Sequence, residues 1–208
     1  MIRCAVFDFD GTLVLSNAIK RAGFFAVTAD FPDSAAAMAR LLADPPGDRF
    51  AIFGAFAAQY GADAEELCGD YGAWCETKIL ACPERGGATA ILEELRRRNL
   101  RIYVNSATPE EPLKALVARR YAPSTFDGVL GGHRAKLANL VAIAAAEGLR
   151  PDNILMIGDG IDDKAAATAF GCGFAGVADG TLAATVSPGP LISDLMGLEA
   201  PFGWGFSL

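Results

Sequence analysis

The chain has 208 residues, of which 52% are hydrophobic and 21% are charged, and its formal net charge is −7. At this length the chain can hold one sizeable core, or one core with a smaller attached module. The composition is typical of a globular protein and argues against a disordered or fibrous chain. Binding to a phosphate backbone requires a basic surface, so the acidic balance predicts no nucleic-acid partner.

No apolar stretch approaches the ~20 residues that span a bilayer, and no basic-then-apolar leader precedes the first apolar run. We therefore expect a cytoplasmic protein with no membrane partner. The five cysteines lack a metal-binding spacing. Cys68, Cys75 and Cys82 recur every seven residues, which predicts that they lie along one side of a helix as small buried apolar groups. The odd number of cysteines and the lack of a metal spacing favour reduced thiols in a cytoplasmic protein.

The first apolar run, residues 4–7, predicts a strand that is buried on both faces of a parallel sheet. Asp8 and Asp10 follow it directly, and residues two apart along a strand point to the same side. Gly11 then permits a sharp turn of the backbone. Burying two unpaired carboxylates is costly, so the pair indicates a compensating group, most simply a divalent cation.

Residues 16–82 are rich in Ala, Phe, Leu and Met and show no strand pattern. Amphipathic helices are predicted at 34–43, 49–60 and 63–80. We expect these residues to form a small helical domain that is inserted into a core domain made of residues 1–15 and 83–208.

From residue 85 onward, helical and strand patterns alternate. Helices are predicted at 88–98, 108–121, 135–147 and 162–170, and strands at 101–105, 128–131, 153–157 and 173–177. This alternation predicts an α/β fold with a doubly wound parallel sheet. Thr108 is expected to cap its helix, with Pro109 in the first turn. The apolar tail, residues 200–208, is expected to pack on its own domain, with a dimer contact as the alternative.

Ligands of open α/β sheets bind beyond the carboxyl ends of the strands, so the polar residues that follow each strand indicate a site. Three of these groups are Asp8 with Asp10, the segment 105–108, and the segment 158–163. The fourth is Lys136, at the start of a helix. All four are expected at one edge of the sheet.

The segment Asp8-Phe9-Asp10-Gly11-Thr12-Leu13 resembles the first motif of the haloacid dehalogenase superfamily. Ser106, Lys136, and Asp159 with Asp163 are similar to its second, third and fourth motifs, in the same order. The resemblance covers residues 1 to about 180, and the helical insert lies where subclass I members, such as phosphoglycolate phosphatases, carry a cap. It implies a Rossmann-like core with an inserted α-helical cap domain.

The resemblance also implies a role for each motif residue. Asp8 would be a nucleophile that forms an aspartyl-phosphate, and Asp10 would protonate the leaving oxygen and then activate water. Ser106 would hold the transferring phosphoryl group, and Lys136 would offset the negative charge.

Mg²⁺ is the expected cofactor. Its ligands would be Asp8, the backbone carbonyl of Asp10, and Asp159, with Asp163 supporting the metal or its waters.

Other interpretations of these residues remain open at this point. Ser106 could only cap a turn, Arg134 could replace Lys136, and Asp162 could cap the helix that follows it. The single histidine, His133, is expected to be structural. Four residues of the insert are candidates for substrate contact, or for the insert's own surface and core: Lys20, Arg21, Tyr71 and Trp74.

The resemblance implies a Mg²⁺-dependent phosphatase that acts on a small phosphorylated metabolite, as a monomer or homodimer. Haloalkanoate dehalogenases lack the acid at the position of Asp10, so its presence favours phosphoryl transfer. A helical lid would exclude water and large substrates. The alternatives are a phosphomutase similar to β-phosphoglucomutase and a binding or regulatory protein with slow turnover.

Overall fold

The computed structural model describes residues 1–178 and 190–198. The chain forms two compact units: the core unit, Met1–Leu15 with the chain from Cys82 onward, and the helical insert, Ser16–Ala81. Cys82, which the sequence analysis assigned to the insert, therefore belongs to the core unit. The predicted packing of the tail, residues 200–208, lies outside the described residues.

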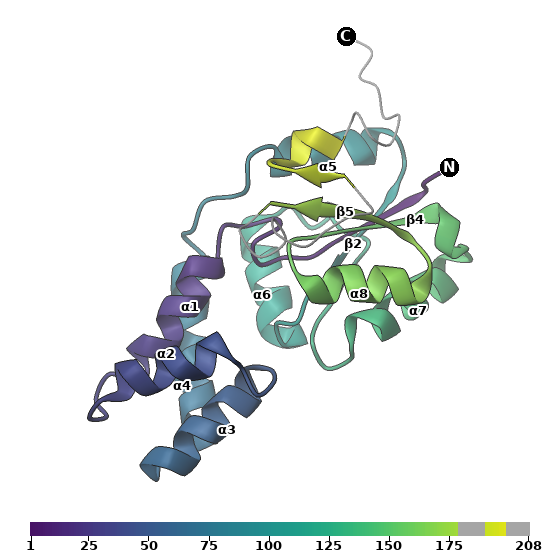
Figure 1. The fold of residues 1–208 in the computed structure, drawn as a ribbon. Coiled ribbons are helices and arrows are strands. Elements are labelled where there is room, and N and C mark those ends of the chain that lie inside the picture. Colours follow the sequence, from purple (N-terminus) through teal and green to yellow (C-terminus); the bar gives the residue numbers. More distant parts are fainter. Residues whose placement is uncertain (179–189, 199–208) are drawn as a thin grey trace. The chain divides into compact units, whose positions relative to one another are not determined.

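The described part of the core unit contains a six-stranded parallel sheet (Figure 1). Its strands are β1 (Cys4–Phe7), β2 (Arg101–Asn105), β3 (Gly128–Leu130), β4 (Ile154–Gly158), β5 (Gly173–Val177) and β6 (Leu191–Ile192). The strand order is β3-β2-β1-β4-β5-β6, and every neighbouring pair is parallel. The order reverses at β1, so the predicted doubly wound sheet is confirmed. The two-residue β6 was not predicted, because it is too short to show a strand period.

Four α-helices and two short 3₁₀ turns accompany the described strands. The helices are α5 (Ala88–Arg97), α6 (Glu110–Arg120), α7 (Lys136–Glu147) and α8 (Ile161–Phe170), and the turns are Pro151–Asn153 and Leu195–Leu198. Cys4 and Val6 of β1 pack in one apolar cluster with Leu140 of α7 and Ala166 of α8. All four residues of β1 are buried, because helices cover both faces of a doubly wound sheet.

The start of α6 differs from the prediction. The helix begins at Glu110 with Pro109 at its N-cap, and no side chain caps it. The Thr108 hydroxyl donates instead to Asp10 Oδ2 at 2.8 Å. A hydrogen bond to a buried carboxylate is stronger than one to a neutral group, which explains why the long-range partner replaces the local cap.

The helical insert contains α1 (Asn17–Ala26), α2 (Ser34–Ala43), α3 (Arg49–Tyr60) and α4 (Ala64–Ile79). The last three lie at the predicted positions, whereas α1 was not predicted as a separate helix. The side chains of Asp48 and Asp63 each accept two backbone N–H groups at the starts of α3 and α4. Cys82 lies beyond the end of α4, so the predicted row of three cysteines on one helix is wrong.

The core of the insert is aromatic. The rings of Phe24 and Phe53 lie 5.1 Å apart between centroids, and Tyr71 lies 4.7 Å from Phe24. Tyr71 is only 3% exposed, so it belongs to the insert's core. The Lys78 Nζ lies over the ring of Trp74, 5.3 Å from the ring centroid.

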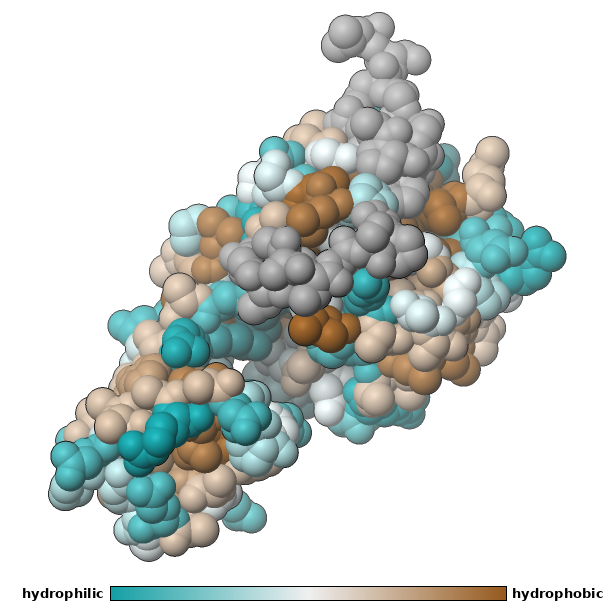
Figure 2. Space-filling model, viewed as in Figure 1, coloured by the Kyte–Doolittle hydropathy of each residue, from teal (hydrophilic) through white to brown (hydrophobic). Residues whose placement is uncertain are grey.

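The visible face of each unit is mixed in character (Figure 2). Figure 2 shows hydrophilic and hydrophobic residues interspersed on the visible face of each unit. Among the described residues, no helix has the length and apolar character needed to cross a membrane. Exposed apolar side chains such as Phe50 and Val141 are common on protein surfaces and need no separate explanation.

Two glycines bring the loop after β3 against the segment after β2. A Cβ atom on Gly131 would lie 2.3 Å from Glu110 Cα, and one on Gly132 would lie 2.3 Å from the Ala107 carbonyl oxygen. Both neighbouring atoms belong to the backbone, so they cannot move aside cheaply. Glycine is therefore required where these two loops meet at the carboxyl edge of the sheet.

The substitution Gly132→Ala should destabilise the core unit by about 1–3 kcal/mol, because the new methyl group overlaps backbone. The matched control is Gly54→Ala in α3, where a Cβ meets nothing within 4 Å. The control should leave stability unchanged or raise it by about 1 kcal/mol through helix propensity. Urea unfolding measures both variants, and equal midpoints would contradict the steric explanation.

Candidate active site

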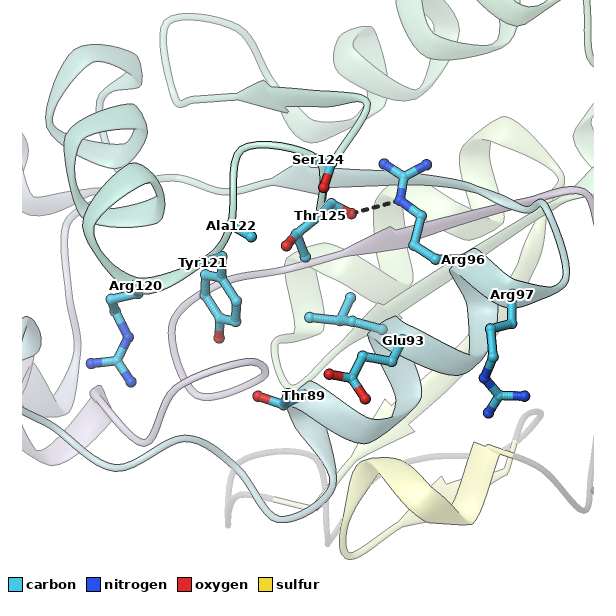
Figure 3. A pocket seen from close by; sticks show the side chains of 10 residues that line it. Thr89, Glu93, Arg96, Arg97, Arg120, Tyr121, Ala122, Ser124 and Thr125 are labelled. Carbon is cyan, nitrogen blue, oxygen red and sulfur yellow. Dashed lines mark hydrogen bonds between the residues drawn. The ribbon is translucent and has the colours of Figure 1, made fainter.

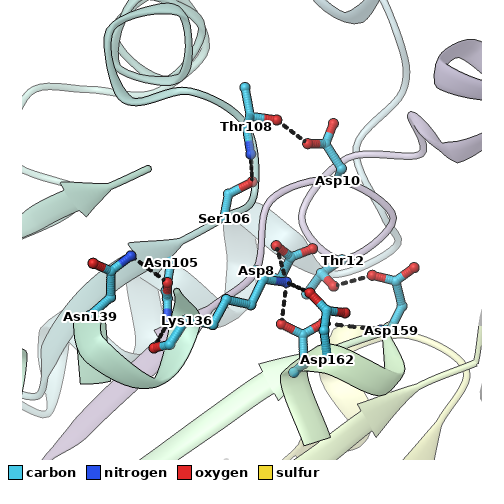
Figure 4. A network of polar contacts seen from close by, with 12 residues as sticks. Asp8, Asp10, Thr12, Asn105, Ser106, Thr108, Lys136, Asn139, Asp159 and Asp162 are labelled. Atoms are coloured by element: carbon cyan, nitrogen blue, oxygen red, sulfur yellow. Dashed lines mark hydrogen bonds and ion pairs between the residues drawn. The ribbon is translucent and has the colours of Figure 1, made fainter. Parts of the chain in front are cut away.

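Four carboxylates are buried at the carboxyl edge of the sheet: Asp8, Asp10, Asp159 and Asp163. Figure 4 labels the first three. Asp8 and Asp10 follow β1, Asp159 follows β4, and Asp163 lies in the first turn of α8. None of them is more than 8% exposed. The topology therefore brings together residues that are far apart in the chain, at the place where such sheets bind ligands.

Lys136, the first residue of α7, reaches into this group of carboxylates. Its Nζ lies 3.1 Å from Asp8 Oδ1, 2.5 Å from Asp163 Oδ1 and 3.0 Å from Asp162 Oδ2. The Lys136 side chain is only 10% exposed, whereas Arg134 is exposed. Of the two basic residues considered from the sequence, Lys136 is the one in ion pairs with the buried acids.

Asp163, and not Asp162, accepts a hydrogen bond from a backbone N–H group at the start of α8. Its Oδ2 accepts the backbone N–H of Gly160 at 3.0 Å, whereas the Asp162 side chain is 62% exposed. The alternative that Asp162 caps this helix is therefore wrong. A Cβ on Gly158 would lie 2.3 Å from Asp163 Cγ, so glycine at the end of β4 leaves room for the buried carboxylate.

The burial of these acids changes their proton affinities. Burial raises the pKa of Asp8 well above its usual range, although Lys136 opposes the effect. Burial likewise raises the pKa of Asp163 to about 7, again against the attraction of Lys136. Burial by itself would lower the pKa of Lys136, but the surrounding carboxylates raise it, so this lysine stays charged.

The acids offer a set of hard oxygen ligands. Asp8, Asp159 and Asp163 each present one carboxylate oxygen, and these oxygens lie within 4.8 Å of one another. Carboxylate oxygens suit Mg²⁺, and a cation would offset the charge that makes this arrangement costly. The Thr12 hydroxyl donates to Asp159 Oδ1 at 2.9 Å and orients it. The three acids can therefore hold a divalent cation.

Asp10 has a different environment from Asp8. Its carboxylate does not belong to the set of three oxygen ligands, and its Oδ2 accepts the Thr108 hydroxyl at 2.8 Å. The backbone N–H of Thr108 donates to Ser106 Oγ at 3.1 Å. Ser106 thus makes the turn-capping contact considered from the sequence, and its own hydroxyl proton takes no part in that contact.

Two residues in this region were missed by the sequence analysis as partners of the acids. Thr12 was named only as part of the first motif, and Thr108 only as a helix cap. Arg85 was not considered at all, although its buried Nε donates to the Gly11 carbonyl at 2.9 Å and so holds the turn after Asp10. No sequence signal could have identified Arg85, because 74 residues separate it from its partner.

A separate pocket lies between α5 and the segment after α6 (Figure 3). It has a volume of about 540 Å³, and none of the predicted site residues lines it. Arg96 Nε donates to the Thr125 carbonyl at 3.0 Å, and Arg96 Nη1 lies 2.8 Å from Asp127 Oδ2. The Arg96 guanidinium is thus already bound to protein groups, and the acidic cluster remains the candidate active site.

The raised pKa of Asp163 predicts a pH-dependent stability. An acid whose pKa is higher in the folded state binds more protons when folded, and this proton binding contributes to the free energy of unfolding. The contribution of Asp163 is fully present below its ordinary pKa of 3.8 and is lost as the pH rises to about 7. In metal-free buffer, the free energy of unfolding of the wild type should therefore fall relative to that of Asp163→Asn over this range.

Urea unfolding with EDTA at several pH values measures this difference. The exposed Asp152→Asn variant is the control and should follow the wild type at every pH. A constant difference between the wild type and Asp163→Asn across this range would contradict the raised pKa.

Comparisons with known proteins identify the family of the chain. The family model of the haloacid dehalogenase-like hydrolases matches residues 2–171. The curated protein sequences contain no match to the chain.

Solved structures share the fold at low sequence identity. A predicted phosphoglycolate phosphatase from Haemophilus somnus is 18% identical with a TM-score of 0.74, over 93% of this chain and 94% of that one. A CbbY variant from Rhodobacter sphaeroides, in complex with xylulose-1,5-bisphosphate, is 16% identical with a TM-score of 0.75, over 93% and 95%. A candidate β-phosphoglucomutase from Thermotoga maritima is 14% identical with a TM-score of 0.71, over 92% and 94%. Since the family model covers most of its length, the chain belongs to the haloacid dehalogenase-like hydrolases.

Proposed function

We propose that this chain is a Mg²⁺-dependent phosphatase that hydrolyses a small phosphate monoester through an aspartyl-phosphate on Asp8. The observation that carries the proposal is the different surroundings of the two acids after β1. Asp8 lies with Lys136 and the candidate metal ligands, whereas Asp10 is bound by Thr108. A nucleophile and an acid/base need such separate environments.

The metal would be held by Asp8 and Asp159, with Asp163 as a ligand or as a support for bound water. The backbone carbonyl of Asp10 is the further ligand that the family resemblance implies. The proximity of the three carboxylate oxygens supports this assignment. When bound, Mg²⁺ would screen the repulsion between Asp8 and an anionic phosphate group.

In the first step, an oxygen of Asp8 attacks phosphorus and the ester P–O bond breaks. Asp10 gives its proton to the leaving alcohol oxygen. In the second step, Asp10 takes a proton from water, the water oxygen attacks the phosphoryl group, and the carboxylate of Asp8 is released. Lys136 neutralises charge on Asp8 throughout, and the Ser106 hydroxyl holds the phosphoryl group.

The comparisons support a small phosphorylated metabolite as substrate. One similar structure is named as a predicted phosphoglycolate phosphatase, and another holds xylulose-1,5-bisphosphate. The second candidate function is a phosphomutase, because a third similar structure is named as a candidate β-phosphoglucomutase. A cytoplasmic location and a monomeric or homodimeric state remain predictions.

Phosphate release from a panel of sugar phosphates, phosphoglycolate and nucleoside monophosphates tests the proposed function. The wild type should release phosphate with Mg²⁺ present and not with EDTA. The Asp8→Asn variant should lose at least about a thousandfold in kcat because the nucleophile is gone, with its far-ultraviolet circular dichroism unchanged.

The exposed Asp152→Asn variant should keep wild-type activity. Wild-type activity in Asp8→Asn would refute the mechanism. A strict requirement for a bisphosphate activator, with little net phosphate release, would favour the phosphomutase. Absence of turnover on every compound would favour a regulatory protein.

The role of Asp10 predicts a dependence on the leaving group. Asp10→Asn should lower kcat for a sugar phosphate by about 10²–10⁴, because an alkoxide leaving group needs a proton. The loss for p-nitrophenyl phosphate should be much smaller, because its leaving group is already stable as an anion. Steady-state kinetics on both substrates measures the contrast, and equal losses would argue against the acid role.

A further inference from the structure

Two fully buried asparagines join β2 to α7. They are Asn105, the last residue of β2, and Asn139, in the first turn of α7. Asn139 Nδ2 donates to Asn105 Oδ1 at 2.9 Å and to the Gly131 carbonyl at 3.3 Å. Asn105 Nδ2 donates to the Lys136 carbonyl at 3.0 Å (Figure 4). The loop between β3 and α7 is therefore held at both of its ends.

The acceptors fix the orientation of both amides. Each Nδ2 faces a backbone carbonyl, which can only accept a hydrogen bond. A carboxylate of the same size could not make these contacts, and an apolar side chain would leave the carbonyls of Gly131 and Lys136 without them. Burying an amide is costly unless it is bonded. Asn139 Oδ1 is buried without a hydrogen-bond partner among the described residues, but the other three polar groups of the pair are bonded, so the pair provides directional contacts that an apolar pair could not.

One of these contacts is made to the backbone of Lys136, the lysine of the candidate active site. Lys136 begins α7, and its N-cap residue, Ala135, has no side-chain acceptor that could fix the first turn. From this backbone position the Lys136 Nζ reaches Asp8 at 3.1 Å and Asp163 at 2.5 Å. Since a displacement of about 1 Å in a catalytic group can cost about 10²-fold in rate, the anchoring of this backbone matters for chemistry.

We propose that Asn105 and Asn139 are positioning residues that act through Lys136, by fixing the backbone from which its ammonium reaches Asp8. The inference rests on the proposed function, in which Lys136 neutralises charge during phosphoryl transfer. A purely structural pair would stabilise the core unit without any specific link to Lys136, and the two cases differ in a measurable way.

A double-mutant cycle between Asn139→Leu and Lys136→Met distinguishes the positioning role from a purely structural role. In the wild-type background, Asn139→Leu should lower kcat by about 10- to 100-fold, with KM changed by less than about threefold. In the Lys136→Met background, Asn139→Leu should cause little further loss, because the group that it positions is gone. The control is Asn153→Leu, which removes an exposed side-chain hydrogen bond from Asn153 Nδ2 to the distant Met1 carbonyl and should leave kcat unchanged.

The same cycle measured by urea unfolding in EDTA gives a readout that is independent of activity. Lys136→Met should change the unfolding midpoint less in the Asn139→Leu background than in the wild type. Independent effects in both cycles would overturn the inference. If Asn139→Leu does not fold, Asn139→Ala takes its place in the cycles with the same expected results.

The failure of this inference differs from the failure of the proposed function. If the wild type releases no phosphate from any compound of the panel, the proposed function fails, and the unfolding cycle alone decides whether the asparagines position Lys136. If the wild type is active but the two substitutions act independently in both cycles, the function stands and the positioning role is refuted.

Discussion

The concentration of buried negative charge at the carboxyl edge of the sheet is the constraint on which the other features of the site depend. Asp8, Asp159 and Asp163 present oxygens within 4.8 Å of one another. Burying these carboxylates together costs free energy unless cations offset their charge. Lys136, whose side chain is only 10% exposed, supplies one such cation beside the acids. A divalent cation would complete the balance. The proposed metal site and the proposed nucleophilic role of Asp8 both depend on this balance of charge.

The two acids after β1 show how environment can separate two identical side chains. Only Phe9 stands between them, yet Asp8 pairs with Lys136 and Asp10 accepts the Thr108 hydroxyl. The first contact places the Lys136 ammonium against a carboxyl group among the candidate metal ligands, where its charge opposes the burial that raises the pKa of Asp8. The second contact fixes one oxygen of Asp10 at a position outside that set. The proposed nucleophile and the proposed acid/base therefore differ in their partners and not in their residue type.

Backbone contacts between loops hold these side chains in place. Gly132 allows the loop after β3 to touch the Ala107 carbonyl, and Asn139 ties the same loop to β2. Arg85 holds the turn after Asp10 through the Gly11 carbonyl. Because each of these groups contacts backbone, the carboxyl edge is fixed at the level of the main chain.

The sequence by itself determined the doubly wound parallel sheet, the helical insert, and the motif residues that gather at one edge. It could do so because the periodicity of apolar residues is local, and because the carboxyl ends of parallel strands must meet at one edge. Only the tertiary structure decided which groups those residues contact. Thr12 and its partner Asp159 are 147 residues apart, and Thr108 bonds to Asp10 although its local sequence favours a helix cap. Hydrogen-bond partners are selected by distance and burial in the folded chain, and a local pattern contains neither.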